Sequence, residues 1–243
     1  MAEATKAAVE PRSVDAGRGI SWWTDAWALF TKSAGMWIVL ALIMIVIFIA
    51  LSFIPFLGSL AVSLLAPAFF GSWLLAARKV ESGGALEVGD LFSAFRDRLT
   101  PLLVVGALLL VASLVIAFVV GALGFGAVIG AVSGGASGSG GAVMAAIGAG
   151  MLALLVALVL GFVVAMAFWF APALIVFHNV APVDALKGSF SASLKNMVPF
   201  LLYSILYLIA AFVASIPLGL GWIVLLPVLM LTAYAAYKDV FGG

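Results

Sequence analysis

The sequence predicts an all-α integral membrane protein with six transmembrane helices, and three observations lead to this fold class. The chain is 66% hydrophobic, and only 9% of its residues are charged, against about 25% in soluble domains. All of its charged residues, 11 Lys or Arg and 10 Asp or Glu, lie in the four short segments 3–32, 78–98, 184–195 and 238–239. An aromatic and proline pattern also recurs three times along the chain.

The uncharged stretches between those segments have the length of membrane spans. A hydrocarbon core of about 30 Å is crossed by about 20 apolar residues in a helix. A charge at its centre costs roughly 2.5–3.5 kcal/mol, so long uncharged stretches favour spans. We expect helices at 36–53, 57–77, 101–122, roughly 142–177, 197–216 and 218–237, which pair into three hairpins.

The distribution of Lys and Arg predicts the orientation. All of them lie in segments that face one side of the membrane if there are six spans. The positive-inside rule makes that side the cytoplasm. We therefore expect a multi-pass protein of the bacterial inner (cytoplasmic) membrane, with both termini cytoplasmic.

Each expected hairpin follows a short amphipathic segment. In each segment apolar residues recur three or four, then seven, then eleven positions after the first, which marks one face of a helix. These residues are Trp23, Trp27, Phe30 and Ala34; Val88, Phe92, Phe95 and Leu99; and Val183, Leu186, Phe190 and Leu194. We expect three cytoplasmic interfacial helices that bury their aromatic faces among lipid headgroups. The alternative is that each is a helical linker that caps the bundle.

A proline lies within the second helix of each hairpin, at Pro67, Pro172 and Pro227. Pro67 lies 37 positions after Phe30, and Pro227 lies 37 positions after Phe190. In the second unit, Pro172 lies 77 positions after Phe95. The second unit thus contains about 40 extra residues (77 − 37), a Gly-rich insertion at about 121–160. Proline kinks a helix. Three equivalent kinks would either surround a central cavity or only curve the bundle.

These patterns predict the domain organisation. Residues 1–19 are small, polar and of mixed charge, so we expect a disordered cytoplasmic tail. Residues 20–243 would form a single six-helix transmembrane domain of three repeated units, 20–79, 80–179 and 180–243. Each unit would be an interfacial helix plus a transmembrane hairpin.

The Gly-rich insertion suggests contact with another protein. Gly126 and Gly130 lie on one helix face and could let another helix pack closely, or they could belong to a flexible loop. For residues 134–141 (GGASGSGG) the composition favours the loop. A helix over 142–177 would exceed the hydrocarbon core. We expect this apolar hairpin to pack against a second copy, to pack against a membrane-protein partner, or to fold back into the bilayer.

The sequence offers little for catalysis. Residues 135–138 spell the GxSG of rhomboid proteases, which also have six spans. The base that such a serine needs has one candidate, His178, which is expected at the opposite membrane face from Ser137. One histidine without cysteine cannot build a metal site. We expect no enzymatic activity, catalytic residues, cofactor or metal, and the net charge of +1 argues against nucleic acid.

One stretch carries a family resemblance. The segment GSFSASLKNMVPFLLYSIL at 188–206, an interfacial helix leading into a hairpin, resembles uncharacterised six-helix proteobacterial inner-membrane proteins. More remotely it is similar to the membrane domain of some bacterial glycerophosphodiester phosphodiesterases. The resemblance covers about residues 20–240. It implies an inner-membrane helical bundle and a role connected with lipids, without catalytic residues.

Two functions follow. The first is a non-enzymatic module that interacts with membrane lipids or supports a partner complex, because anionic headgroups attract basic residues near the surface. Its predicted headgroup rim is Trp22, Trp23, Trp27, Lys32, Arg78, Lys79, Arg96, Arg98, Lys187 and Lys195. The second is a channel or carrier for a neutral or apolar solute. A pore should place Ser63, Ser204, Tyr207 and Thr232 on one lumen.

Overall fold

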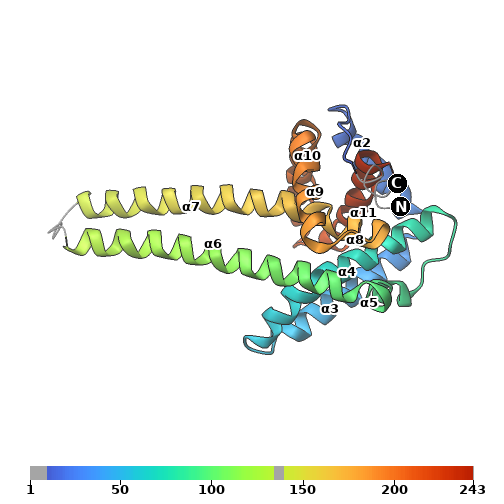
Figure 1. The fold of residues 1–243 in the computed structure, drawn as a ribbon, viewed down its shortest axis with the longest axis horizontal. Coiled ribbons are helices and arrows are strands. Elements are labelled where there is room, and N and C mark those ends of the chain that lie inside the picture. The colour runs from blue at the N-terminus through green and yellow to red at the C-terminus, as the bar shows by residue number, and fades with distance from the viewer. Residues whose placement is uncertain (1–9, 134–139, 243) are drawn as a thin grey trace. The chain divides into compact units, whose positions relative to one another are not determined.

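The computed structural model describes residues 10–133 and 140–242, and every regular element in those ranges is helical (Figure 1). The elements are α2 (Arg18–Thr31), α3 (Ala34–Ser52), α4 (Leu57–Glu81), the 3-10 helix η1 (Val88–Phe92), α5 (Ala94–Asp97), α6 (Leu99–Ser133), α7 (Gly140–Trp169), α8 (Ala171–His178), α9 (Pro182–Lys195), α10 (Met197–Ser215) and α11 (Trp222–Phe241). Within the described ranges, six stretches are long and apolar enough to cross a membrane: 34–52, 57–81, 99–126, 147–178, 197–215 and 222–241. The predicted all-α fold with six candidate spans is confirmed.

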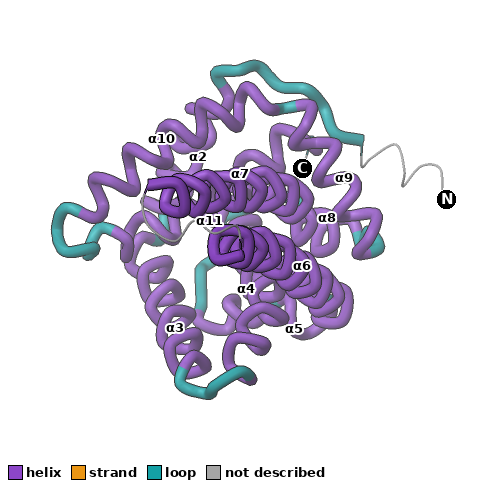
Figure 2. The backbone as a smooth tube through the Cα atoms, turned by 90° about the vertical axis from the view of Figure 1, so that its left-hand side faces the viewer, coloured by secondary structure: helices purple, strands orange, loops and turns teal. Residues whose placement is uncertain are grey.

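The chain divides into two compact units. The hairpin unit is Leu108–Ala165, and the bundle unit is the rest of the chain, up to Ala107 and from Met166 onward. In the hairpin unit, arms from α6 and α7 run side by side in opposite directions (Figures 1 and 2). Large apolar side chains such as Phe118, Phe125 and Met151 are exposed there, as expected for a surface that faces an apolar environment.

The Gly-rich insertion is more helical than the sequence predicts. We expected the third span to end near residue 122, but α6 continues to Ser133 because its apolar residues continue without a proline. Most of the expected loop at 134–141 lies outside the described residues, and 140–141 begin α7. Among the described residues, a Cβ on Gly126 would have no neighbouring atom within 4 Å, so this glycine makes no close helix contact with them. Gly130 lies in α6.

Three inner helices form the centre of the bundle unit. About half of the residues in the spans of α4 and α11 are buried (50% and 56%), against 22% in α3 and 17% in α10. Residues 171–176 of α8 are all buried. Helix α4 contacts both α8 and α11. The predicted prolines Pro67, Pro172 and Pro227 lie one in each inner helix, and all three are buried.

The prolines act differently. Pro67 and Pro227 lie within α4 and α11, whereas the expected single helix over 142–177 is broken at Phe170, where α7 gives way to α8. Pro172 explains the break, because its ring clashes with the carbonyl four residues earlier and it lacks an N–H. The expected span is therefore made of two helices, and the interruption lies beside the proline at which a kink was expected.

A serine from α9 fills the gap that the break opens. In a continuous helix the Phe170 N–H would bond to the carbonyl of Met166. Here the N–H donates to Ser189 Oγ (2.9 Å), and Ser189 Oγ donates to the Met166 carbonyl (2.7 Å). The Ser193 hydroxyl donates to the same carbonyl (3.1 Å). Both hydroxyls are buried, so α9 satisfies backbone groups that would otherwise be orphaned.

The expected interfacial helices pack against protein. Helix α2 contacts α10 and α11, and Gly19 makes close approach possible, because a Cβ there would lie 2.0 Å from the Pro199 carbonyl oxygen. Helix α9 contacts α8 and α10. The middle segment differs from the expected helix over 88–99, because η1 and α5 replace it. Both η1 and α5 contact α4.

The segment before α2 is tied to the bundle. Arg12 N–H donates to the Val240 carbonyl (2.8 Å), and Val14 N–H donates to Asn196 Oδ1 (2.9 Å). The buried Asn196 amide donates to the Arg12 carbonyl (2.9 Å). Arg12 and Val14, which we expected in a disordered tail up to residue 19, are therefore held in place by these bonds. Residues 1–9 lie outside the described ranges.

Candidate functional site

Charged and tyrosine side chains meet where the three inner helices end. Tyr234 on α11 donates from its hydroxyl to Glu81 Oε2 at the end of α4 (2.7 Å). Lys238 donates to the other oxygen of Glu81, so both oxygens of this carboxylate are occupied. Phe177 on α8 stacks on Tyr237, with ring centroids 4.8 Å apart. This end of the bundle unit is therefore held by polar and aromatic contacts between α4, α8 and α11.

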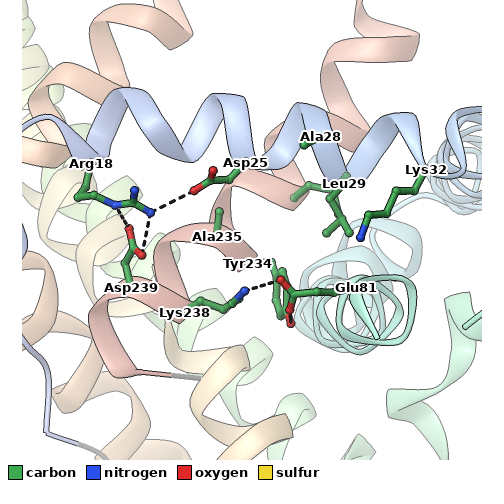
Figure 3. A pocket seen from close by; sticks show the side chains of 11 residues that line it. Arg18, Asp25, Ala28, Leu29, Lys32, Glu81, Tyr234, Ala235, Lys238 and Asp239 are labelled. Atoms are coloured by element: carbon green, nitrogen blue, oxygen red, sulfur yellow. Dashed lines mark hydrogen bonds and ion pairs between the residues drawn. The ribbon is translucent and has the colours of Figure 1, made fainter. Parts of the chain in front are cut away.

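The first pocket here lies between α2, α4 and α11 and has a volume of about 320 Å³ (Figure 3). Asp239 forms its strongest contact. Arg18 donates to this carboxylate from Nε (2.5 Å) and Nη2 (2.9 Å), and Trp22 donates from Nε1 (2.7 Å). Arg18 also reaches Asp25 (3.1 Å). The hydrogen bond to Asp239 is the main reason why the pKa of Arg18 is raised above its ordinary value.

The pocket contains one cation, Lys32, that forms no close ion pair but lies near a carboxylate. Figure 3 shows Lys32 reaching from α2 toward Glu81, which is already bound by Lys238. Among the residues that the structure describes, Lys32 forms no ion pair. The pocket is thus lined by three bases and three acids, but its carboxylates are committed to Arg18 and Lys238.

The second pocket, which we call the Arg78 pocket, has a volume of about 360 Å³. It is lined by Arg78, Glu81, Ser82, Phe177, His178, Tyr234 and Tyr237. The guanidinium carbon of Arg78 lies 5.1 Å from the centre of the Phe177 ring, a cation–π contact. In the described part of the chain, the Arg78 side chain makes no hydrogen bond or ion pair. Its five N–H donors are free for a ligand or water.

His178 and Tyr237 supply another donor beside Arg78. His178 Nε2 lies 2.7 Å from the Tyr237 hydroxyl. A single hydrogen serves this contact. If Tyr237 donates it, the neutral imidazole keeps its proton on Nδ1; if His178 donates it, the hydroxyl hydrogen is free. Either arrangement leaves one donor unused.

Helix termini oppose anions at this place. The negative ends of the α4, α8 and α11 dipoles favour cations by about 0.3–1 kcal/mol each at an exposed surface. Helix caps bond some of the free carbonyl groups at these ends. Asn179 caps α8 and Gly242 caps α11; both have positive φ, and their N–H groups bond to carbonyls of the last turn. One charge-assisted hydrogen bond contributes about 1.5–3 kcal/mol. Two such bonds from Arg78 would exceed the combined effect of the dipoles.

Comparison with known proteins identifies the family. A family described as a domain of unknown function, DUF7847, matches residues 24–240. The chain belongs to DUF7847. A probable inner membrane protein of Burkholderia thailandensis is 28% identical over 227 residues, which cover 91% of this chain and 82% of that protein. No solved structure matches.

With six apolar helices, this DUF7847 chain is a multi-pass inner membrane protein. The family and the relative agree with the expected uncharacterised inner-membrane family. They lend no support to the remote likeness to glycerophosphodiester phosphodiesterases.

The predicted aromatic rim of the DUF7847 protein is only partly exposed. Trp22 is fully buried and bonded to Asp239, so it cannot contact headgroups; the prediction for this residue was wrong, because the apolar face of α2 is covered by protein. Trp23 is half-buried and stacks on Tyr203, with ring centroids 5.4 Å apart. Trp27 is 52% exposed and remains available.

The predicted basic residues separate into three groups. Lys32 and Arg78 line the two pockets. Three others are engaged by the protein itself. These are Lys79, bonded to Asp90 (2.9 Å); Arg98, bonded to Asn179; and Lys195, bonded to the Pro11 carbonyl (3.2 Å). Arg96 and Lys187 are exposed.

Sequence reasoning missed most of the polar residues that build the pockets. Glu81, Tyr234, Tyr237, Lys238 and Asp239 were counted only as span ends or topology signals. A signal existed, because Tyr234 and Tyr237 lie three apart in the last turns of α11, just before a Lys–Asp pair, and share one helix face. The sequence does not indicate that α2 and the end of α4 pack against that face of α11.

The described residues contain no candidate metal site. Over 10–133 and 140–242, no three His, Cys, Asp or Glu side chains form a cluster that could hold a metal ion. The imidazole of His178 is engaged with Tyr237. The rhomboid-like residues 135–138 lie outside the described ranges.

Proposed function

We propose that this DUF7847 protein is a non-enzymatic inner-membrane module whose cytoplasmic end interacts with anionic lipids. The observation that carries the proposal is the end of the bundle unit described above, where Lys32 and Arg78 line pockets and form no ion pair within the described chain. Aromatic side chains accompany them where the apolar spans stop, as is usual at a membrane–water interface. Anionic headgroups attract bases in this position by about 1 kcal/mol each.

We further propose that the bundle has three repeated units with both termini in the cytoplasm. Each inner helix is bonded to one interfacial segment. Ala94 N–H of α5 donates to Ser72 Oγ of α4 (3.0 Å), Ser189 of α9 bridges the break before α8, and Trp22 of α2 donates to Asp239 of α11. The last contact returns to the first unit, which is the pattern that a cyclic threefold repeat would show.

The orientation can be tested because the chain contains no cysteine. A single cysteine at the exposed position Ser191 of α9 should react with a membrane-impermeant maleimide only from the cytoplasmic side. One at Leu218, in the turn between α10 and α11, should react only from the other side. Labelling of both from the same side would contradict the topology.

The alternative of a pore receives less support. Ser63 donates to the Ser59 carbonyl (2.9 Å), and Ser204 donates to the Phe200 carbonyl (2.7 Å). The buried Thr232 donates to the Leu229 carbonyl (2.7 Å). Each of these hydroxyls bonds to a carbonyl of its own helix, and Thr232 also contacts the Tyr203 hydroxyl of α10 (3.1 Å). Neither of the two pockets described above includes them or Tyr207.

The lipid proposal is tested by extraction in native-lipid particles followed by lipid analysis. Phosphatidylglycerol and cardiolipin should be enriched over their share of the whole membrane. Lipid in the same proportions as the membrane would contradict the proposal. Mass spectrometry of the same particles would also show whether they contain a second copy of the chain or another protein. Either would support the expected packing of the hairpin unit against protein.

A further inference from the structure

We infer that the Arg78 pocket is a binding site for a phosphate-type oxyanion, the group shared by phospholipid headgroups and free phosphate. This inference rests on the proposed lipid interaction and assigns it to one place. Arg78 is the residue that would bind the anion, with the His178–Tyr237 pair supplying a further hydrogen bond.

The first argument is that Arg78 is positioned without using its donors. Phe177 lies beneath the guanidinium at 5.1 Å, and Phe177 is itself fixed by stacking on Tyr237 at 4.8 Å. This cation–π contact requires no hydrogen bond from Arg78, and its N–H groups bond to no other described residue. These donors are therefore available to bond two oxygens of one phosphate.

The second argument concerns charge. Glu81 lines the same pocket and would repel an anion if its charge were unopposed. Lys238 and the Tyr234 hydroxyl occupy its two oxygens, and Lys32 points toward it from α2 (Figure 3). The carboxylate is therefore neutralised from the neighbouring pocket. Arg78 is the cation left uncompensated in its own pocket.

The third argument concerns position. Arg78 lies in the last turn of α4, His178 is the last residue of α8, and Tyr237 lies in the last turns of α11. The apolar spans end at this level, which is where lipid phosphates lie. The pocket volume of about 360 Å³ also accommodates a phosphate with part of its ester. Both a lipid headgroup and a soluble phosphate could therefore reach Arg78.

The test compares the protein and its Arg78→Gln variant in two settings. In the first, both are placed in phosphatidylcholine discs that contain a minor fraction of phosphatidylglycerol, and retained lipid is measured by native mass spectrometry. In the second, both are held in micelles of a maltoside detergent, which contains no phosphate, and are titrated with inorganic phosphate, and thermal stability is compared with chloride at equal ionic strength. Arg96→Gln is the matched control, because Arg96 is exposed and lies outside both pockets.

We expect Arg78→Gln to weaken anion binding about 10-fold to 100-fold, the loss typical of hydrogen bonds to a charged group. Arg96→Gln should bind like the unaltered protein. Loss confined to phosphatidylglycerol would identify the lipid headgroup as the ligand, and loss confined to phosphate would identify the free anion. Arg78→Lys retains the positive charge but not the planar set of guanidinium donors, so its affinity for the anion should be intermediate. An unchanged melting temperature of this variant would show that the weaker binding does not come from misfolding.

Two results would overturn the inference in distinguishable ways. If Arg78→Gln binds like the control while the unaltered protein still enriches anionic lipid, the site is elsewhere and the proposed function stands. If the unaltered protein shows no preference for phosphatidylglycerol and no response to phosphate, the site and the lipid function both fail.

Discussion

Removing the Ser189 hydroxyl tests whether α9 stabilises the break between α7 and α8. This hydroxyl is fully buried and bonds both to the Phe170 N–H and to the Met166 carbonyl. In Ser189→Ala the Met166 carbonyl keeps its bond from Ser193, so the Phe170 N–H is the one group that loses its partner.

The expected loss of stability follows from these contacts. An orphaned buried donor costs about 1–3 kcal/mol. Alanine is a better helix former than serine by about 0.5 kcal/mol, which offsets part of that cost. We expect the free energy of unfolding to fall by about 0.5–2.5 kcal/mol. The double variant with Ser193→Ala should lose more, because the Met166 carbonyl is then orphaned as well.

The seven tryptophans make fluorescence a convenient measure of unfolding in detergent or lipid particles. Ser191→Ala is the matched control, since Ser191 lies on the exposed face of the same helix. Equal stability of the Ser189 and Ser191 variants would refute the reasoning. It would mean that Phe170 can bond directly to Met166 despite Pro172. In a Pro172→Ala background, where nothing prevents that closure, the Ser189 substitution should cost less.

Two further substitutions test how α2 is attached. Gly19→Ala should destabilise the protein by about 1–3 kcal/mol, because its Cβ would overlap the Pro199 carbonyl, whereas Gly17→Ala, with nothing within 4 Å, should leave melting unchanged. Trp22→Phe keeps an aromatic ring but removes the N–H bonded to Asp239, and should cost about 1.5–3 kcal/mol in denaturant unfolding. A Gly19 variant as stable as the Gly17 variant, or a Trp22 variant as stable as the parent, would argue against this docking.

The spans could be predicted because one free-energy cost, that of placing a charged side chain in the hydrocarbon core, determines where they can lie. No charged residue interrupts an expected span, and the first, second and fifth helices begin within two residues of the predicted positions. The end of the third helix was missed for a different reason. Hydrophobicity indicates where a helix can be in lipid, but it does not limit a helix that continues beyond it, as α6 does to Ser133.

The candidate site was largely hidden because amphipathic patterns do not reveal what covers the apolar face. The spacing of Trp22 and Trp23 fits a helix on lipid as well as one on protein. The serine that bridges the helix break shows the same limit. Ser189 reads as a small residue on an amphipathic helix, and its role depends on a backbone that opens 19 residues earlier in the chain.

The contact between Arg18 and Asp239 has a consequence for synthesis, because the two residues are 221 positions apart. When α2 leaves the ribosome, the Arg18 guanidinium can bond only to Asp25 of the same helix, and the Trp22 N–H has no partner until α11 has been made and inserted. The first four spans must therefore enter the membrane before α10 and α11, the helices on which α2 docks, have been made. Closure of the bundle is then the last event in assembly, and a chain that stalls before α11 would display the apolar face of α2 to the quality-control machinery.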